Sequence, residues 1–150
     1  MRRVDIEATL AVAAPPEVAY AALQDMGDWA TWNTLVHRVA VDREGPDDYD
    51  AWYVDLGAQI GPVQLTRHWR MVRVEATPSR FVRYERFEVA DAGADHSDAV
   101  IEATLRSDGQ WTLRLFYSGF LPIPGLVPFT RGEIAKSLQR LNARLEAAAP

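Results

Sequence analysis

The chain has 150 residues, of which 48% are hydrophobic and 25% are charged. This length and balance suit one globular domain spanning residues 1–150 and disfavour intrinsic disorder. The net charge of −5 argues against binding to nucleic acid and against docking on anionic membranes through a basic patch. Because the chain has no cysteine, disulfides, thiol nucleophiles and zinc–thiolate sites are excluded.

We expect neither a secretory signal nor a membrane helix in this sequence. Its N-terminus, MRRVDIEATL, is charged and soon alternates, unlike a signal peptide. The longest uncharged segment, residues 115–130, contains three prolines and cannot form a membrane helix. We therefore expect a cytoplasmic protein with no stable membrane insertion.

The N-terminal quarter predicts a strand and two short helices. Apolar residues alternate with polar ones over residues 4–12, which is typical of a half-buried strand. Two prolines followed by Glu17 suit the first turn of a helix, which we expect Gly27 to end. Tryptophans at helical spacing indicate a second short helix or turn over residues 28–33.

Alternation then returns, and each gap in it carries a turn signal. It predicts six further strands, near residues 35–43, 49–57, 62–74, 80–89, 98–107 and 110–119. The sharpest turn signal is Asp108-Gly109, which favours a type I′ hairpin because glycine adopts positive φ without strain. Consecutive hairpins make the sheet antiparallel.

The chain ends with a long amphipathic helix. Thr130 and Glu133 match the T-x-x-E capping box that begins a helix. An apolar stripe follows at spacings of four, three and four, formed by Ile134, Leu138, Leu141 and Leu145. Such a stripe must be buried against a sheet face. We predict an α+β fold in which a seven-stranded curved antiparallel sheet surrounds the C-terminal helix, with two short helices after the first strand.

One stretch, ATLAVAAPPEVAYAALQDMGDWATWN (residues 8–33), is similar to the bacterial polyketide cyclase/dehydrase pattern. The positions that match it are Ala14, Pro15, Glu17, Val18, Leu23, Asp25, Trp29 and Trp32. Tyr20 stands where that pattern more often has tryptophan. Together with the element order, which spans nearly the whole chain, this resembles the helix-grip fold of the START-like (SRPBCC) superfamily. That superfamily includes polyketide cyclases, plant pathogenesis-related allergens and lipid-transfer domains.

The resemblance implies a cavity between the sheet and the C-terminal helix. Its mouth would be framed by residues 25–34, the hairpin turns and the loop before the last helix. Fold similarity of this kind identifies function poorly, because the superfamily mixes enzymes with plain binding proteins.

Arg67 is the charged residue most clearly predicted to lie inside. The face of the 62–74 strand with more apolar mass comprises Val63, Leu65, Arg67, Trp69, Met71 and Arg73. A buried arginine is unfavourable unless it is paired. One interpretation is an anion or carbonyl clamp on a ligand, as a cavity arginine is thought to provide in aromatic polyketide cyclases. The other is an arginine at the cavity edge, paired with a glutamate such as Glu85 or Glu102.

Aromatic residues are the next candidates for ligand contacts. Trp29 and Trp32 fall at the expected mouth, and Trp52 falls on an apparent inward face. For these three, ligand stacking and core packing are equally acceptable interpretations, whereas core packing better explains Trp69 and Trp111. Tyr117 offers a phenol either for a ligand or for a buried backbone group.

Histidines give no metal site, and we expect no cofactor. His37, His68 and His96 are far apart and show no metal-ligand spacing. His37 is expected to face inward, either as a general base or as a histidine hydrogen-bonded inside the core. Motifs of serine hydrolases, P-loop proteins and dinucleotide-binding proteins are missing.

The loop of residues 119–129, GFLPIPGLVPF, is apolar yet interrupted by proline and glycine. An exposed loop of this composition promotes aggregation. We interpret it as a flap at the cavity mouth, the alternatives being a homodimer contact or transient membrane docking that loads a lipid. The candidate contacts here are Phe120, Leu121, Ile123, Leu126 and Phe129, with Leu138 from the helix stripe.

Three functions follow from these features. The first is a binding protein for a hydrophobic or aromatic small molecule, acting as a monomer or homodimer. The second is an aromatase/cyclase acting on a poly-β-ketone, in which Arg67 with Tyr117 or His37 assists enolisation and dehydration. The third is an interaction module with a filled core.

Overall fold

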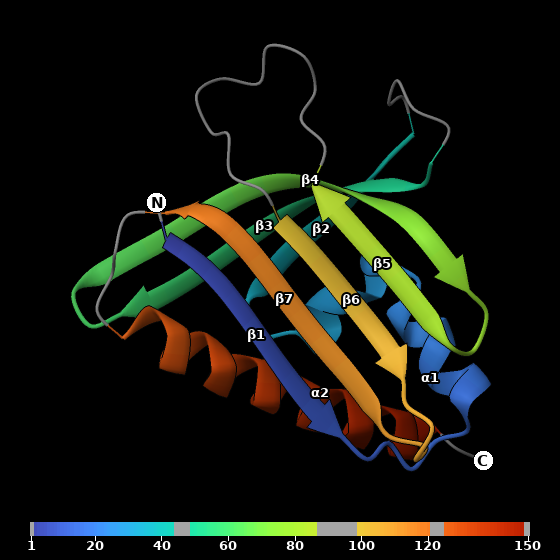
Figure 1. The fold of residues 1–150 in the computed structure, drawn as a ribbon. Helices are drawn as coiled ribbons and strands as arrows, with labels where there is room; N and C mark the ends of the chain where they lie inside the picture. The colour runs from blue at the N-terminus through green and yellow to red at the C-terminus, as the bar shows by residue number, and fades with distance from the viewer. Residues whose placement is uncertain (1, 44–48, 87–98, 121–124, 149–150) are drawn as a thin grey trace.

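The computed structural model describes residues 2–43, 49–86, 99–120 and 125–148. Its seven strands form one antiparallel sheet in the order β1-β7-β6-β5-β4-β3-β2. They are β1 (Arg2–Leu10), β2 (Val36–Asp42), β3 (Ala51–Ile60), β4 (Val63–Thr77), β5 (Phe81–Arg86), β6 (Ala99–Leu105) and β7 (Trp111–Phe120). The sheet curves over the long C-terminal helix α2 (Leu126–Ala148), as Figure 1 shows. The predicted helix-grip architecture is confirmed.

Two short helices follow β1, as expected, but the first ends earlier than Gly27. Helix α1 (Pro16–Leu23) is followed by the 3-10 helix η1 (Met26–Thr31). Asp25 separates them, because its backbone is extended (φ −110°, ψ 101°) and its carboxylate accepts a hydrogen bond from Gly27 N–H at 2.9 Å. Gly27 therefore belongs to the second helix, where an aspartate cap that the sequence analysis did not recognise begins a new turn.

The hairpin between β6 and β7 is not the type I′ turn predicted from Asp108-Gly109. Gly109 has a φ of 85°, but among the described residues Ser79 is the only non-glycine with positive φ, so Asp108 lacks the conformation that type I′ needs. The turn closes through Gly109 N–H donating to Arg106 O at 3.0 Å. Asp108 Oδ1 accepts from Gln110 N–H at 3.0 Å, a local bond typical of aspartate in turns.

The predicted capping box at Thr130 is also wrong, because α2 begins one turn earlier. Its first backbone bond runs from Phe129 N–H to Gly125 O at 3.0 Å. Pro128 is tolerated in this first turn, where amide N–H groups have no helical partner. The hydroxyl of Thr130 donates to Leu126 O at 2.8 Å inside the helix instead of capping it.

The apolar stripe of α2 is buried as predicted. Its four members are Ile134, Leu138, Leu141 and Leu145, all at most 7% exposed. Two polar contacts tie the same helix to the end of η1 and the segment after it, since Arg144 donates to the Thr31 hydroxyl and Ser137 Oγ accepts from Thr34 N–H at 2.9 Å. None of the helices in the described ranges is both long and apolar enough to cross a membrane.

A shared carbonyl joins the short helices to the sheet. Leu23 O, at the end of α1, accepts from the Tyr84 hydroxyl at 2.6 Å and from Trp29 Nε1 at 3.1 Å. The Trp29 and Tyr84 rings meet edge to face, with centroids 5.4 Å apart. Both side chains are fully buried, and this burial raises the pKa of the Tyr84 phenol well above its usual value. The phenol therefore stays protonated and serves as a hydrogen-bond donor.

Replacing Tyr84 with phenylalanine should lower the free energy of unfolding by about 1–2 kcal/mol, because it removes a buried hydrogen bond. Leu23 O would keep its bond from Trp29 Nε1, so the loss should not exceed that range. The measurement is urea denaturation followed by circular dichroism. Tyr53→Phe is the matched control, since Tyr53 is 48% exposed and should change stability by less than about 0.5 kcal/mol. Equal effects in the two variants would contradict the role given to Tyr84.

Candidate functional site

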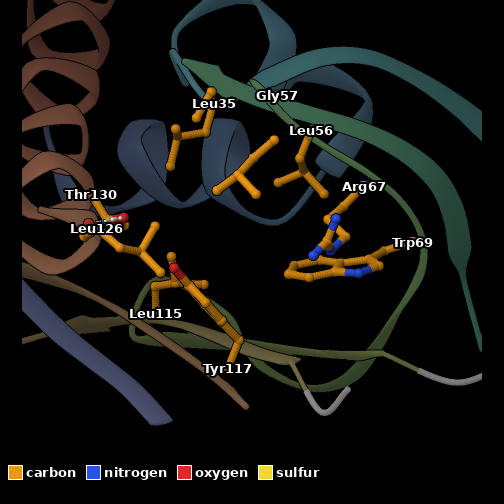
Figure 2. Close-up of a pocket in the computed structure, with 11 residues that line it drawn as sticks. Leu35, Leu56, Gly57, Arg67, Trp69, Leu115, Tyr117, Leu126 and Thr130 are labelled. Atoms are coloured by element: carbon orange, nitrogen blue, oxygen red, sulfur yellow. Dashed lines mark hydrogen bonds between the residues drawn. The ribbon is translucent and has the colours of Figure 1, made fainter. Parts of the chain in front are cut away.

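A pocket lies between the inner face of the sheet and the first turns of α2. Its apolar walls are Leu35, Leu56, Gly57, Ala58, Leu65, Leu115 and Leu126. Four further residues that line it carry polar atoms, namely Arg67, Trp69, Tyr117 and Thr130. The volume is about 70 Å³. Figure 2 shows Arg67 and Trp69 at one end of the pocket and Leu126 and Thr130 at the other.

Strand pairing places these side chains on one face. In the antiparallel register of β3 and β4, Leu56 lies opposite Arg67 and Ala58 lies opposite Leu65. Directly opposite residues share a face of the sheet, and residues two apart on a strand share it too. Side chains two residues apart on β7 also share a face, and Leu115 and Tyr117 both line the pocket from that strand. The inward face predicted for the 62–74 strand is thus the face that lines the pocket.

Arg67 and Trp69 are adjacent on the inner face of β4. Arg67 is half-buried, and its Nη1 donates to Thr66 O at 2.9 Å. The alternative partners, Glu85 and Glu102, lie on the outer face, where both carboxylates bond to Arg83 at 3.0 and 2.6 Å. Neither glutamate is therefore the partner expected for Arg67.

Trp69 is only 4% exposed, and its indole Nε1 is buried without a hydrogen-bond partner. Most buried polar groups in proteins are hydrogen-bonded, so an unpaired one in a pocket wall is unusual. The ring also lies near Tyr117, with centroids 6.3 Å apart. The sequence analysis preferred core packing for Trp69, yet this indole belongs to both the core and the pocket wall.

Tyr117 contributes a buried phenol to the pocket. Burial raises the pKa of Tyr117 above its usual value of 10, while hydrogen bonding with the Thr130 side chain and the positive charge of Arg67 act in the opposite direction. The phenol is therefore protonated at neutral pH and available as a proton donor rather than as a base.

Trp29 and Trp32 are in the core rather than at a mouth. Both are 0% exposed, and their ring centroids are 4.8 Å apart. Neither is among the residues that line the pocket. The expected placement relied on the segment of residues 25–34 lying over an opening, but η1 turns both indoles inward, where Trp29 packs on Tyr84.

Trp52 lies beside a different, open hollow. The hollow has a volume of about 530 Å³ and is lined by Gln24, Asp25, Gly27, Val41, Arg43, Asp50, Trp52 and Arg73. The Arg73 guanidinium lies 5.7 Å from the centre of the Trp52 ring and bonds to Gln24 and Asp50. Because protein groups already engage this arginine, we assign no ligand to the hollow.

His37 is exposed, and the expectation that it faces the interior is wrong. The register of β2 on β3 shifts between Val36 and Arg38, which is a bulge at His37. A bulge moves one residue out of the alternating pattern. Its ring lies against Gly57, where an added Cβ would be 2.6 Å from His37 Cε1. The backbone of β3 therefore separates this imidazole from the pocket.

The proline-rich segment contributes less than expected in the described residues. Leu126 lines the pocket, whereas Phe129 and the buried stripe residue Leu138 do not. Leu121 and Ile123 lie outside the described residues, as does the side chain of Phe120. Within the described ranges, no group of three or more histidine, aspartate or glutamate side chains could hold a metal ion.

Of the apolar wall, only Leu126 was predicted as a site residue, although alternation placed Leu65 on the predicted inward face. Leu56 and Leu115 share a face with the predicted site residues Trp52 and Tyr117. That these residues meet Ala58 at one pocket depends on the register between β3 and β4, which a single sequence does not reveal. Thr130 was interpreted as a helix cap, and that interpretation concealed its place in the pocket.

Several solved structures share this fold at low sequence identity. Zhui aromatase/cyclase from Streptomyces sp. R1128 is 20% identical, with a TM-score of 0.57 over 97% of this chain and 94% of that chain. The di-domain ARO/CYC StfQ from the steffimycin biosynthetic pathway is 17% identical, with a TM-score of 0.61 over 97% of this chain and 52% of that chain. Ginseng major latex-like protein 151 from Panax ginseng is 7% identical, with a TM-score of 0.64 over 95% of this chain and 97% of that chain. At these identities the likeness shows the fold alone.

The sequence itself matches a family profile over almost its full length. No functionally curated protein matches the chain. The profile described as polyketide cyclase / dehydrase and lipid transport matches residues 3–146. The match includes the stretch from Ala8 to Asn33, on which the resemblance was based, and every strand and helix that lines the pocket. The chain therefore belongs to the polyketide cyclase / dehydrase and lipid transport family.

Proposed function

We propose that this protein binds a small hydrophobic or aromatic molecule in the pocket between the sheet and α2. The observation that carries the proposal is the composition of the pocket wall, where seven apolar residues surround four that carry polar atoms. Sites for small molecules typically combine an apolar lining with a few placed polar groups. Membership of a family described by cyclases, dehydrases and lipid transport supports the same class of ligand.

The size of the pocket limits the ligand. Its volume of about 70 Å³ is well below the roughly 300–1,000 Å³ of pockets for drug-sized molecules. The ligand is therefore small, or one end of a longer molecule enters. Gly57 and Ala58 leave part of the β3 wall free of large side chains, and Leu65, the strand partner of Ala58, lies beside them on β4.

Filling the pocket should weaken binding without unfolding the protein. Ala58→Phe places a ring in the pocket, and we expect it to weaken binding of p-cresol and 2-naphthol by at least roughly tenfold, since overpacking costs about 1–3 kcal/mol. Gln59→Phe is the control, because Gln59 is exposed on the opposite face of the same strand. Binding is measured by titration of ¹⁵N-labelled protein in NMR spectra. If the wild-type protein binds neither probe, the proposed function is wrong.

The second candidate function is an aromatase/cyclase that acts on a poly-β-ketone. The observation in its favour is that Arg67 and the protonated phenol of Tyr117 line the same pocket. A guanidinium can polarise a ketone oxygen while solvent water takes the α-proton, and a phenol can give its proton to the developing enolate oxygen or to a departing hydroxyl. Two relatives of the same fold are described as aromatase/cyclases, which supports testing this activity.

For this activity, Tyr117→Phe should lower kcat on a poly-β-ketone thioester by roughly 10²-fold, the usual contribution of a general acid. Because the acid form is active and burial raises the pKa of Tyr117 above 10, the wild-type rate should be constant across neutral pH and fall only above pH 10. The assay separates cyclised and dehydrated products by liquid chromatography and mass spectrometry. If the protein binds aromatic probes but forms no product, the aromatase/cyclase function is wrong and the binding function still stands.

A further inference from the structure

The two edge strands of the sheet are covered to different extents. β1 lies at one end of the strand order and β2 at the other. Helix α2 packs against β1. On β2, Val36 is buried near η1, but residues 38–41 are exposed or half-buried, and Val41 is 49% exposed. The open backbone groups of an edge strand can pair with another chain, so β2 is a candidate interaction surface.

The open backbone groups of this edge belong to Val39 and Val41. In an antiparallel strand, the N–H and C=O of one residue point to the same side, and this side alternates along the chain. Gly57 N–H donates to Leu35 O at 3.1 Å, and β3 pairs with β4 without a register shift. The odd-numbered residues of β3 therefore point toward β2, where their partners are Arg38, Ala40 and Asp42. The N–H and C=O groups of Val39 and Val41 then point away from β3, toward the open edge.

We propose that β2 is a dimer interface, to which a second copy of this chain adds its own β2 in the antiparallel direction, centred on Ala40. Val39 then lies opposite Val41 of the second copy, and each strand uses these two residues to exchange backbone hydrogen bonds with the other. Because the contact has two-fold symmetry, both copies use the same surface and the dimer is closed. The ligand pocket takes no part, so this inference stands apart from the proposed function.

Side-chain size and polarity favour this register over its neighbours. At the centre, Ala40 lies opposite its own copy in a pair without hydrogen bonds, where Cα atoms approach to about 4.5 Å and a small side chain fits. On the inner face, valine meets valine. Centring the pair on Val39 would instead place Val41 opposite His37, at the bulge, and centring it on Val41 would place Val39 opposite Arg43. Neither alternative covers both valines with apolar side chains.

Charges on the outer face support the antiparallel direction. The register places Arg38 opposite Asp42 of the second copy, and the symmetry repeats this pair. Asp42 already accepts a hydrogen bond from Arg70 Nε at 2.8 Å, so the added ion pair contributes little strength. It contributes direction, because parallel strands in register would place Arg38 beside its own copy, and like charges repel each other.

The surroundings of β2 leave space for the second copy. On the inner face, Val41 and Trp52 border the open hollow of about 530 Å³. On the outer face, Tyr53 lies opposite Ala40 and is 48% exposed. Both faces of this edge therefore carry apolar surface in contact with solvent. Pairing removes part of it from water, because Val39 of the second copy covers Val41.

Sedimentation equilibrium of the wild-type protein is the first test. One pair of short strands forms a small interface compared with the roughly 1,200–2,000 Å² of stable complexes, so we expect a Kd of about 100 µM. The weight-average mass should rise from 16.8 kDa toward twice that value between about 10 µM and about 1 mM protein. If the protein stays monomeric over this range, the proposal is wrong.

Two variants test the edge itself. Val39→Pro removes an N–H that points to the open edge and none that bonds to β3, and proline is tolerated on edge strands in that orientation. Val41→Lys places a charge where valine should meet valine. Each should raise Kd by at least roughly tenfold. Val63→Lys is the matched control, since it makes the same substitution at an exposed valine on β4 and should leave Kd unchanged.

NMR locates the interface in the wild-type protein even if a variant fails to fold. In a mixture of ¹⁵N-labelled and unlabelled protein, the labelled amide proton of Val39 should show an NOE to the amide proton of Val41 of the unlabelled copy, since the two are paired. The Val39 and Val41 amides should also exchange with deuterium more slowly as the protein concentration rises. A dimer that lacks both effects, or that persists unchanged in Val39→Pro and Val41→Lys, uses another surface and overturns the proposal.

Discussion

The rest of the structure depends on burial of one apolar stripe. Ile134, Leu138, Leu141 and Leu145 give α2 a single apolar face, and a helix with such a face must cover it. Removing each large aliphatic side chain from water contributes about 1.5–3 kcal/mol. The seven strands supply a wide surface, and they curve so that one sheet can contact the helix along its length. The concave inner face follows from this requirement.

The pocket exists because the stripe does not fill the whole concave space. The stripe begins at Ile134, whereas α2 begins at Leu126, two turns earlier. Over those first turns the helix offers Leu126 and Thr130, and the opposite wall includes the small residues Gly57 and Ala58. Where large side chains from both layers are absent, a space remains. Arg67, Trp69 and Tyr117 complete the wall around this apolar space.

Predictions about the site succeeded or failed according to whether local alternation was regular. Arg67 and Trp69 lie where β4 pairs with β3 without a register shift, and both line the pocket as their spacing indicates. His37 lies at a bulge in β2, so the same reasoning placed it on the wrong face. Trp29 lies in η1 and Trp32 caps its C-terminal end, and Trp29 packs on Tyr84, which is 55 residues further along the chain.

Local patterns in the sequence specify the order of the elements, the antiparallel sheet and the gripping helix, because alternation, turn residues and a helical stripe are signals that burial reinforces. The same patterns place Arg67 and Tyr117 on inward faces. Which inward residues meet at the pocket depends on long-range packing. Leu56, Ala58 and Thr130 join it through strand register and through a helix that starts one turn before its apparent cap. Such contacts depend on residues far apart in the chain, and no local pattern encodes them.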